Sequence, residues 1–386
     1  MDLSGSKDLR AKELERRIIL SQYLLRVQEA GNHPPQETGL TYNSWYGRPH
    51  MEMLWWHTTQ YALWGRSNLM EKNMAWYFKA FNGAQEIARR QGYAGVRWQK
   101  MTDNEGGDSP SNIGSFLIWQ QPNIIYQAEL LYREKPSKEL LKKYNRLISA
   151  TADFMASFAR YNDRTGFFDL GKGIMPAQEH YNPAETFNSP YELAYWKWAL
   201  QIAQKWRARQ GLTPDKSWQK VIDKLAPLPQ TDGVYIGAEN ITDAYSPASK
   251  LRADHPAVLM AYGLLPANGT VDTVIMKKTF EVVNRVWEWG NTWGWDYPTA
   301  AMTATRLNQP EDAIDMLFKN AKANTFLPNG HNYQNKTLTI YLPGNGGLLS
   351  AVALMCTGAD GNKVKNPGFP KNGNWNVKWE GLKRLP

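Results

Sequence analysis

Cysteine is almost missing from this chain. Cys356 is the single cysteine in 386 residues, which excludes an internal disulfide and a cysteine-based metal cluster. It ends the apolar run 351–356, and we interpret it as a small core residue. Long hydrophobic runs are also lacking, so no segment reaches the length that spans a membrane. The polar residues 1–8 do not have the pattern of a signal peptide.

Dense blocks of one charge are missing as well. The formal net charge is +9, which could suit nucleic acid or an anionic substrate. Lys and Arg are scattered, however, and the densest runs, 10–17 and 138–143, alternate with Glu as solvent-exposed helix faces do. We therefore expect no nucleic-acid partner and no membrane partner, while an anionic substrate stays open.

Motifs for cofactors, metals and nucleophiles are not found. The chain has no Gly-x-Ser-x-Gly, Walker or dinucleotide-binding sequence. His50 and His57 are too far apart on a helix to share one ion, and neither has a carboxylate at zinc-binding spacing. The Gly-rich runs 103–107 and 344–347 are interpreted as turns. The sequence therefore predicts neither a cofactor nor a metal.

Strand signals are scarce, and helical periodicity dominates. The clearest strand-like runs are 234–236 and 375–379, whereas apolar residues recur at i, i+3, i+4 and i+7 in about twelve segments. Gly31 marks a helix end, and Ser189-Pro190 and Thr213-Pro214 mark helix starts. The predicted helices cover 8–30, 50–64, 70–91, 115–134, 137–160, 189–210, 214–225, 254–264, 271–288, 296–307, 310–322 and 346–356.

The lengths of the connections predict how these helices are arranged. Most connections before the even-numbered helices are long, and those before the odd-numbered helices are short. Long loops without structure of their own are usually functional. This alternation predicts an all-α fold, an (α/α)6 barrel over 8–357, with its long loops at one end and a short irregular or β tail, 358–386, packed on it. The long connections are 31–49, 92–114, 161–188, 226–253, 289–295 and 323–345.

Aromatic residues are abundant, with 17 Trp and 19 Tyr. Flat rings stack on sugar faces while neighbouring amides and carboxylates bond hydroxyl groups. Because a large aromatic residue at helical spacing is more often part of a core, we expect about half of those near the long loops to be buried and the rest to line a carbohydrate site. The aromatic residues near the long loops are Trp45, Tyr46, Trp55, Trp56, Trp98, Trp119, Trp293, Trp295 and Tyr297.

The loop before the sixth predicted helix carries the main catalytic candidate. Glu179 lies there among Gln178, His180, Tyr181 and Asn182. In such a setting a carboxyl group can stay protonated until a leaving group takes the proton. An isolated Glu would more often cap a surface loop, but the position of this loop at the functional end of the barrel favours a catalytic acid.

Six segments, in their order along the chain, resemble those of six-hairpin glycosidases. The chain resembles over nearly its whole length the catalytic barrel of glycoside hydrolase families 65 and 95, which include maltose and kojibiose phosphorylases, acid trehalase and α-1,2-fucosidases. The segments are 43–57, Gly-Val-Arg-Trp-Gln-Lys-Met (95–101), Ile-Trp-Gln-Gln-Pro (118–122), Pro-Ala-Gln-Glu-His-Tyr (176–181), Trp-Gly-Trp-Asp-Tyr-Pro (293–298) and Leu-Pro-Gly-Asn-Gly-Gly (342–347).

The resemblance implies roles for particular residues. Glu179 matches the general acid of the family, and Glu52 matches a residue that bonds sugar hydroxyls. The match at 95–101 implies that Arg97, Trp98 and Lys100 line the substrate, and Asp254-His255 falls where a polar pair points into the site. The other residues expected to bind substrate are Trp45, Trp56, Trp119, Gln120, Gln178, His180, Trp295 and Asn345.

The resemblance also bears on organisation and location. Relatives carry an N-terminal β-sandwich before the barrel, and this chain opens almost directly on the first predicted helix. The family suggests a periplasmic or extracellular protein, whereas the lack of a signal peptide leaves the cytoplasm open.

The chain departs from the family at the second catalytic partner. Pro343 stands where a fucosidase-like Asp would be, and 321–358 contain no Asp or Glu. An inverting hydrolase needs a carboxylate to activate water. Asp296 and Asp254 are the best candidates and Glu52 is third, although each could instead offset a helix dipole at an N-terminus.

Three functions follow from these patterns, with an oligosaccharide or glycoside as the ligand in each. The first is an inverting glycoside hydrolase with Glu179 as the acid. The second is a glycoside phosphorylase in which Arg97, Lys100 or His331 would hold phosphate. The third is a carbohydrate-binding barrel without catalysis, and a polysaccharide lyase or epimerase stays as a remainder.

Overall fold

The computed structural model describes residues 1–386 and contains twelve α-helices with only short strand pairs. The predicted all-α class is confirmed. The helices are α1 (Arg10–Gln28), α2 (Leu54–Leu63), α3 (Ser67–Arg90), α4 (Asn123–Glu134), α5 (Lys138–Phe158), α6 (Pro190–Arg209), α7 (Lys216–Lys224), α8 (Met260–Gly263), α9 (Thr273–Val286), α10 (Asp296–Arg306), α11 (Pro310–Leu317) and α12 (Leu342–Thr357).

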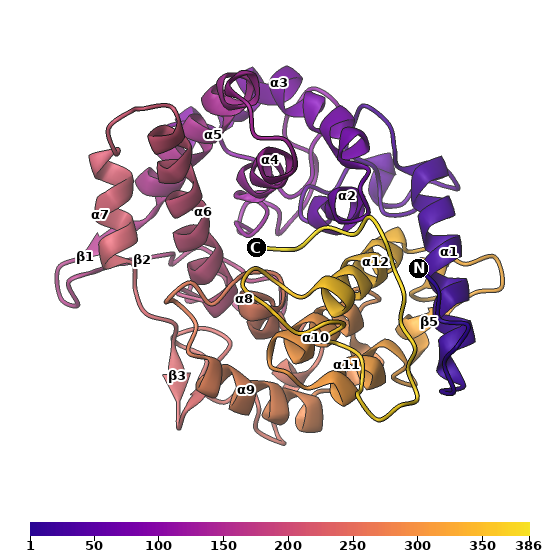
Figure 1. Ribbon diagram of the computed structural model, residues 1–386. Coiled ribbons are helices and arrows are strands. Elements are labelled where there is room, and N and C mark those ends of the chain that lie inside the picture. Colours follow the sequence, from indigo (N-terminus) through magenta and orange to yellow (C-terminus); the bar gives the residue numbers. More distant parts are fainter.

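The even-numbered helices form an inner ring. Helices α2, α4, α6, α8, α10 and α12 each contact the next one, and α12 contacts α2, which closes the ring (Figure 1). The odd-numbered helices lie outside this ring, so the predicted (α/α)6 barrel is confirmed. The long connections lead to the N-terminal ends of the inner helices.

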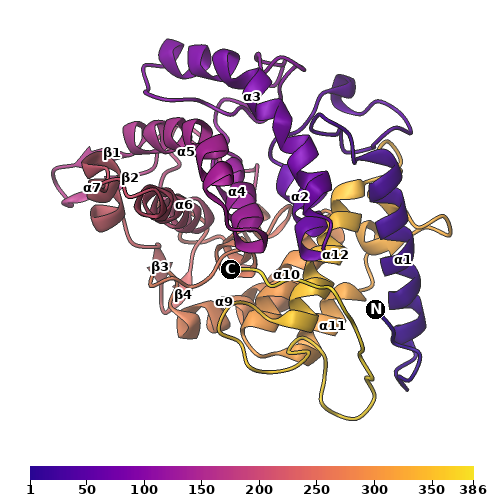
Figure 2. The same cartoon turned by 45° about the horizontal axis from the view of Figure 1, so that its top comes forward.

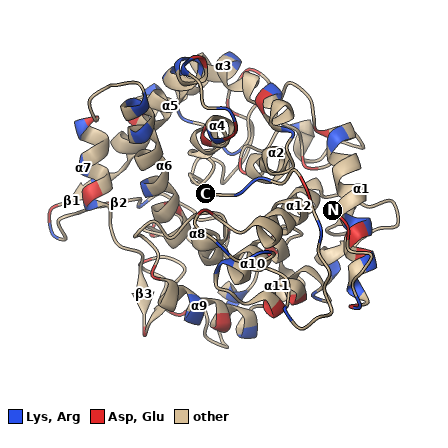
Figure 3. Cartoon of the chain, viewed as in Figure 1, with Lys and Arg blue, Asp and Glu red and all other residues tan.

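Composition explains which helices lie inside. Every residue of α2 and of α12 is buried, and neither helix contains Lys, Arg, Asp or Glu. The charged residues of the chain gather instead on outer helices such as α1, α3, α5 and α9 (Figure 3). Burial of the apolar inner helices is the main force that closes the ring, since it removes apolar surface from water.

Several helix starts follow the expected capping chemistry. The side chains of Ser137, Asp215 and Asp272 accept hydrogen bonds from backbone N–H groups in the first turns of α5, α7 and α9. Pro190 and Pro310 lie in the first turns of α6 and α11. The missing N–H of proline costs nothing there, because an N–H in the first turn has no partner within the helix.

Three antiparallel strand pairs stand beside the ring. The pairs are β1 (Arg160–Asn162) with β2 (Phe167–Asp169), β3 (Gln230–Thr231) with β4 (Val234–Tyr235), and β5 (Thr325–Phe326) with β6 (Asn332–Tyr333). Asp232 and Gly233 join β3 to β4 with φ of 54° and 73°, the geometry of a tight hairpin turn. The strand predicted near 234 is therefore present.

Four local predictions were wrong. The run 375–379 forms a single bridge, between Asp2 and Lys378, and no strand, because no extended segment lies beside the rest of the run. Helix α12 begins at Leu342, so the Gly-rich run 344–347 is helical, since Pro343 suits a first turn and small residues let α12 approach α2. Helix α4 begins at Asn123, after turns over 115–122. Helix α8 is only one turn, preceded by a 3-10 turn at Ala257–Leu259.

The C-terminal residues of the chain cross the barrel end that is formed by the C-termini of α2 and α10. The N–H of Lys383 donates to the carbonyl of Leu63 at 2.8 Å, and Arg306 donates to the carbonyl of Pro386 at 2.8 Å. The tail passes over α10, α11 and α12 and meets the N-terminal segment (Figure 2). Phe369, Val377, Leu382 and Leu385 join the same hydrophobic core as the barrel helices. None of the helices is long and apolar enough to cross a membrane.

Candidate active site

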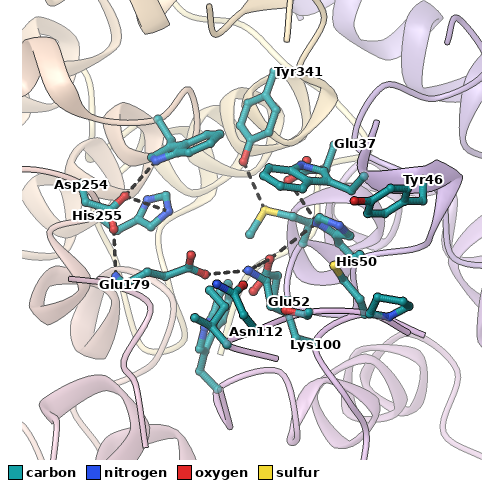
Figure 4. Close-up of a pocket in the computed structure, with 18 residues that line it drawn as sticks. Glu37, Tyr46, His50, Glu52, Lys100, Asn112, Glu179, Asp254, His255 and Tyr341 are labelled. Atoms are coloured by element: carbon teal, nitrogen blue, oxygen red, sulfur yellow. Dashed lines mark hydrogen bonds and ion pairs between the residues drawn. The ribbon is translucent and has the colours of Figure 1, made fainter. Parts of the chain in front are cut away.

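A cavity of about 530 Å³ opens among the long connections, at the N-terminal ends of the inner helices (Figure 4). Each of the six inner helices is preceded by a connection that contributes to its wall. The lining residues are Glu37, Trp45, Tyr46, His50, Glu52 and Met53 before or at the start of α2; Lys100, Met101, Pro110, Ser111, Asn112, Ile113 and Trp119 before α4; Glu179 before α6; Asp254 and His255 before α8; Trp293 before α10; and Tyr341 before α12.

Lys100 joins two carboxylates in this cavity. Its Nζ donates to Glu179 Oε1 at 2.8 Å and lies 3.3 Å from Glu52 Oε1. Burial alone lowers the pKa of Lys100, but Glu52 and Glu179 outweigh burial and raise that pKa above its usual range. Burial also raises the pKa of Glu52 to about 7, despite the opposing effect of Lys100. Glu179 keeps 29% of its side chain exposed, whereas Glu52 is buried.

Asp254 contacts the backbone of the Glu179 loop. Its Oδ2 accepts the N–H of Glu179 at 2.9 Å, and its Oδ1 accepts the indole N–H of Trp293 at 2.8 Å. The backbone of Asp254 is left-handed, with φ of 64°, a conformation that Asp tolerates better than most residues. A hydrogen bond from the indole N–H of Trp287 to the carbonyl of Asp254, at 3.0 Å, helps to hold it.

His255, which lines the cavity, pairs with Asp296 behind it. His255 Nδ1 lies 3.0 Å from Asp296 Oδ1, and the imidazole stacks on Trp295 with ring centroids 4.1 Å apart. Burial lowers the pKa of His255, but Asp296 and Asp254 outweigh it and raise that pKa to about 9. Asp296 is fully buried and accepts the N–H of Trp293 at 2.8 Å. Burial raises the pKa of Asp296.

Glu37 and His50 form a second ionisable pair, across the cavity from Glu179 (Figure 4). His50 Nδ1 lies 3.5 Å from Glu37 Oε1 and 3.6 Å from Glu52 Oε1. Burial would raise the pKa of Glu37, but His50 and Lys100 hold that pKa below its usual value.

The structure brings seven of the predicted site residues together around the cavity. They are Glu52, Trp45, Lys100, Trp119, Glu179, Asp254 and His255. They come from four of the long connections, which the barrel gathers at one end.

Other predicted site residues lie behind the cavity wall. The Arg97 guanidinium donates to the carbonyls of Leu117 and Ser115, at 2.7 and 3.2 Å. Trp98 donates to Thr151, and Gln120 donates to the carbonyls of Trp98 and Leu117. Arg97 and Gln120 therefore tie the connection before α4 together, and Trp98 ties it to α5.

The remaining predicted residues also lie outside the lining. Trp56 and Trp295 are fully buried and stack on each other, with ring centroids 4.8 Å apart. Gln178 donates to the carbonyls of Leu251 and Ala253, and Asn345 donates to Ser21 and to the carbonyl of Gly330. His180 is exposed, outside the cavity. Asp296 is fully buried and lies behind His255, so it does not face the cavity.

Several lining residues were not among the predicted site residues. The acidic and basic ones are Glu37 and His50, and the others are Met53, Met101, residues 110–113 and Tyr341. The available signals were that most of them lie in predicted long connections and that His50, Met53 and Met101 fall within the segments that resemble six-hairpin glycosidases. Helical periodicity cannot say which loop side chains turn inward.

Comparison with known proteins supports the fold. No protein-family model matches the chain, and no curated protein matches it in sequence. A solved structure assigned as a kojibiose phosphorylase from the human microbiome superposes with a TM-score of 0.72 at 13% identity, over 94% of this chain and 58% of that one. A solved glycosidase superposes with a TM-score of 0.67 at 12% identity, over 88% of this chain and 97% of that one.

A third match is a sugar epimerase from a ruminal bacterium, with a TM-score of 0.50 and 13% identity over 89% of this chain. The chain thus spans 58% of the length of the phosphorylase structure but 97% of the length of the glycosidase structure. Identities this low establish architecture alone, because one fold supports several reactions. The chain has the helical barrel fold that is shared by glycosidases and a kojibiose phosphorylase.

Proposed function

We propose that this protein is a glycoside hydrolase with Glu179 as the proton donor. The observation that carries the proposal is the convergence of four carboxylates, Glu37, Glu52, Glu179 and Asp254, on one cavity with aromatic walls. Two of them, Glu52 with a raised pKa and Glu37 with a lowered one, have the shifted pKa values that tend to gather at catalytic sites. The solved structures that share the fold include a glycosidase and a kojibiose phosphorylase, which adds support for chemistry at a glycosidic bond.

Glu179 is placed to reach a bound sugar. It lines the cavity, is partly exposed, and is held from two sides by Lys100 and by the contact of Asp254 with its N–H. A carboxylic acid in this position would protonate the glycosidic oxygen as the bond to the anomeric carbon breaks. Trp119, Trp293 and Tyr341 supply flat surfaces for the sugar ring.

We propose that inversion is the stereochemical course, with water attacking from the face opposite Glu179. Asp254 and Asp296 are less suited to activate that water than their sequence positions suggest. Both carboxylate oxygens of Asp254 already accept hydrogen bonds, one from Trp293 and one from the Glu179 N–H. Asp296 is buried behind His255. Their contacts favour a role in positioning Glu179 and His255.

The placement of cations favours hydrolysis over phosphorolysis. Of the residues considered for phosphate, Arg97 is buried on backbone carbonyls, and His331 contacts Gln28 away from the cavity. Lys100 does line the cavity, but it is engaged by Glu52 and Glu179. A phosphate there would meet several carboxylates with little compensating charge.

Hydrolysis is tested with a panel of nitrophenyl glycosides, glycosyl fluorides and disaccharides, with and without inorganic phosphate. We expect release of free sugar that does not depend on phosphate, and proton NMR of the first product should show the inverted anomer. Formation of a sugar phosphate would establish the phosphorylase instead. Sugar binding without turnover of any substrate would indicate a carbohydrate-binding barrel.

A further inference from the structure

Glu37 reaches the cavity from the first long connection, which the sequence did not mark as catalytic. Its side chain is buried and lines the cavity wall. Its backbone carbonyl accepts the N–H of Leu342, the first residue of α12, at 2.9 Å. This bond ties the loop before α2 to the start of the last inner helix, which fixes the backbone from which the carboxylate projects.

The two oxygens of the Glu37 carboxylate lie in different surroundings. Oε1 faces His50 Nδ1 at 3.5 Å, whereas the buried Oε2 has no hydrogen-bond partner within the protein. Oε2 is closed to a water-sized molecule. Because Glu37 lines the cavity, Oε1, beside His50, is the oxygen left to meet a molecule there.

Glu37 also lies opposite Glu179. Contacts run from Glu179 to Lys100, from Lys100 to Glu52, from Glu52 to His50 and from His50 to Glu37, at 2.8, 3.3, 3.6 and 3.5 Å. Glu179 and Glu37 are the two ends of this row, with the cavity between them (Figure 4). An inverting reaction requires such an arrangement, because a sugar and a water must fit between the acid and the base.

The other carboxylates around the cavity are engaged differently. Asp254 lies on the Glu179 side and contacts its backbone. Glu52 contacts the ammonium of Lys100, and burial raises its pKa to about 7, so it is partly protonated near neutral pH. The pKa of Glu37 is instead held below its usual value by His50 and Lys100, which outweigh burial. Glu37 therefore stays ionised, as an acceptor of a proton must.

We propose that Glu37 is the general base of the hydrolysis, an inference that rests on the proposed function. Oε1 of Glu37 takes a proton from the attacking water, and the water oxygen forms a bond to the anomeric carbon. The bond from that carbon to the glycosidic oxygen breaks, and the oxygen takes the proton of Glu179. One proton enters the protein at Glu37 and one leaves it at Glu179, so charge and atoms balance.

The test compares Glu37→Gln and Glu37→Ala with wild type on the nitrophenyl glycoside or glycosyl fluoride that wild type cleaves fastest. Loss of a general base should lower kcat by about 100- to 10,000-fold. Sodium azide, a nucleophile that needs no base, should restore turnover and yield a glycosyl azide of inverted configuration. Glu139→Gln, which alters an exposed carboxylate on the outer helix α5, serves as the matched control and should behave as wild type.

Circular dichroism and quenching of tryptophan fluorescence by the product sugar show whether the Glu37 variants fold and bind. Folded variants that keep more than about a tenth of wild-type kcat would overturn the assignment. So would folded variants with low activity that azide does not restore, because Glu37 would then act on structure alone. Failure of wild type to cleave any glycoside would overturn the proposed function, which separates the two conclusions.

Discussion

Two neighbours hold Glu179 in different ways. Lys100 fixes the direction of its side chain at 2.8 Å, and Asp254 fixes its backbone through the N–H at 2.9 Å. Glu179, although it lies in a loop, is thus fixed by contacts with two other long connections. The variants below separate proton transfer from positioning.

Glu179→Gln keeps the shape of the side chain but removes the proton donor of the proposed reaction. We expect kcat for substrates with poor leaving groups to fall about 100- to 10,000-fold, with sugar binding preserved. Substrates with good leaving groups should lose less, because they need little protonation. Steady-state kinetics on a leaving-group series measures this, and equal turnover of all substrates by wild type and variant would exclude Glu179 as the acid.

Asp254→Asn should reveal a positioning role. One amide oxygen can still accept from Trp293, but the NH₂ group opposes the N–H of Glu179. Misplacement of a catalytic group by about 1 Å can cost about 100-fold in rate, so we expect a loss of that order in kcat. Added azide should not restore kcat of this variant, because its proposed base is intact. Restoration by azide would instead identify Asp254 as the base and contradict the assignment to Glu37.

Glu192 offers a test of pH dependence outside the cavity. It is fully buried at the start of α6, where Ser189 donates to its Oε2 at 2.6 Å, and burial raises its pKa to about 7 from 4.5. The folded state therefore binds this proton more tightly than the unfolded state. The resulting stability is full below pH 4.5 and is lost as the pH rises towards 7.

Glu192→Gln removes this titration. Between about pH 5 and about pH 8, the free energy of unfolding of wild type should fall relative to that of the variant, by on the order of 3 kcal/mol. Urea unfolding of both proteins at the two pH values measures the difference. Parallel pH profiles would show that Glu192 is not the source of the pH dependence.

At the scale of helices, the fit between α2 and α12 depends on glycine. A Cβ at Gly346 would lie 1.9 Å from the carbonyl oxygen of Trp56, far inside contact distance. Helix propensity alone would favour alanine there by about 1 kcal/mol. The close approach of the two helices is therefore what requires glycine, and it also explains why a Gly-rich run forms a helix.

Gly346→Ala should lower the free energy of unfolding by about 1–3 kcal/mol, because the added methyl group forces α12 away from α2. Gly31→Ala is the matched control, since nothing lies within 4 Å of a Cβ at that position. Urea denaturation of both variants gives the two values. A stabilised Gly346→Ala variant would mean that the helices separate easily and that propensity dominates.

For the whole molecule, the tail closes the barrel at the end away from the cavity. Leu385 is fully buried, and its neighbours Lys383 and Pro386 bond to the C-terminal ends of α2 and α10. The cavity lies at the N-terminal ends of the same helices. The tail contacts and the cavity thus lie at opposite ends of the barrel.

Leu385→Ala should reduce the free energy of unfolding by about 2–5 kcal/mol through loss of burial and creation of a cavity. Values of kcat and KM well below the unfolding temperature should stay unchanged. Leu9→Ala is the control, because Leu9 is 95% exposed and should affect neither property. A large change in KM for Leu385→Ala would show that the two ends of the barrel are coupled.

The sequence by itself determined the helical class, the barrel and the end at which the long connections gather. Apolar periodicity and connection length are local properties, and they were enough to place the long loops, Glu179 among them, together. Even so, local patterns failed where packing decided the outcome, as in the glycine-rich start of α12.

Only the tertiary structure decided which side chains face the cavity. The sequence pattern predicts Arg97, Trp98 and Asp296 as site residues. In the structure they lie behind the cavity wall and bond to backbone or to other side chains. Glu37, in a loop without a motif, reaches the cavity because its backbone is bonded to Leu342. The direction of a loop side chain depends on contacts between segments far apart in the chain. The sequence of the loop has no periodicity from which those contacts could be predicted.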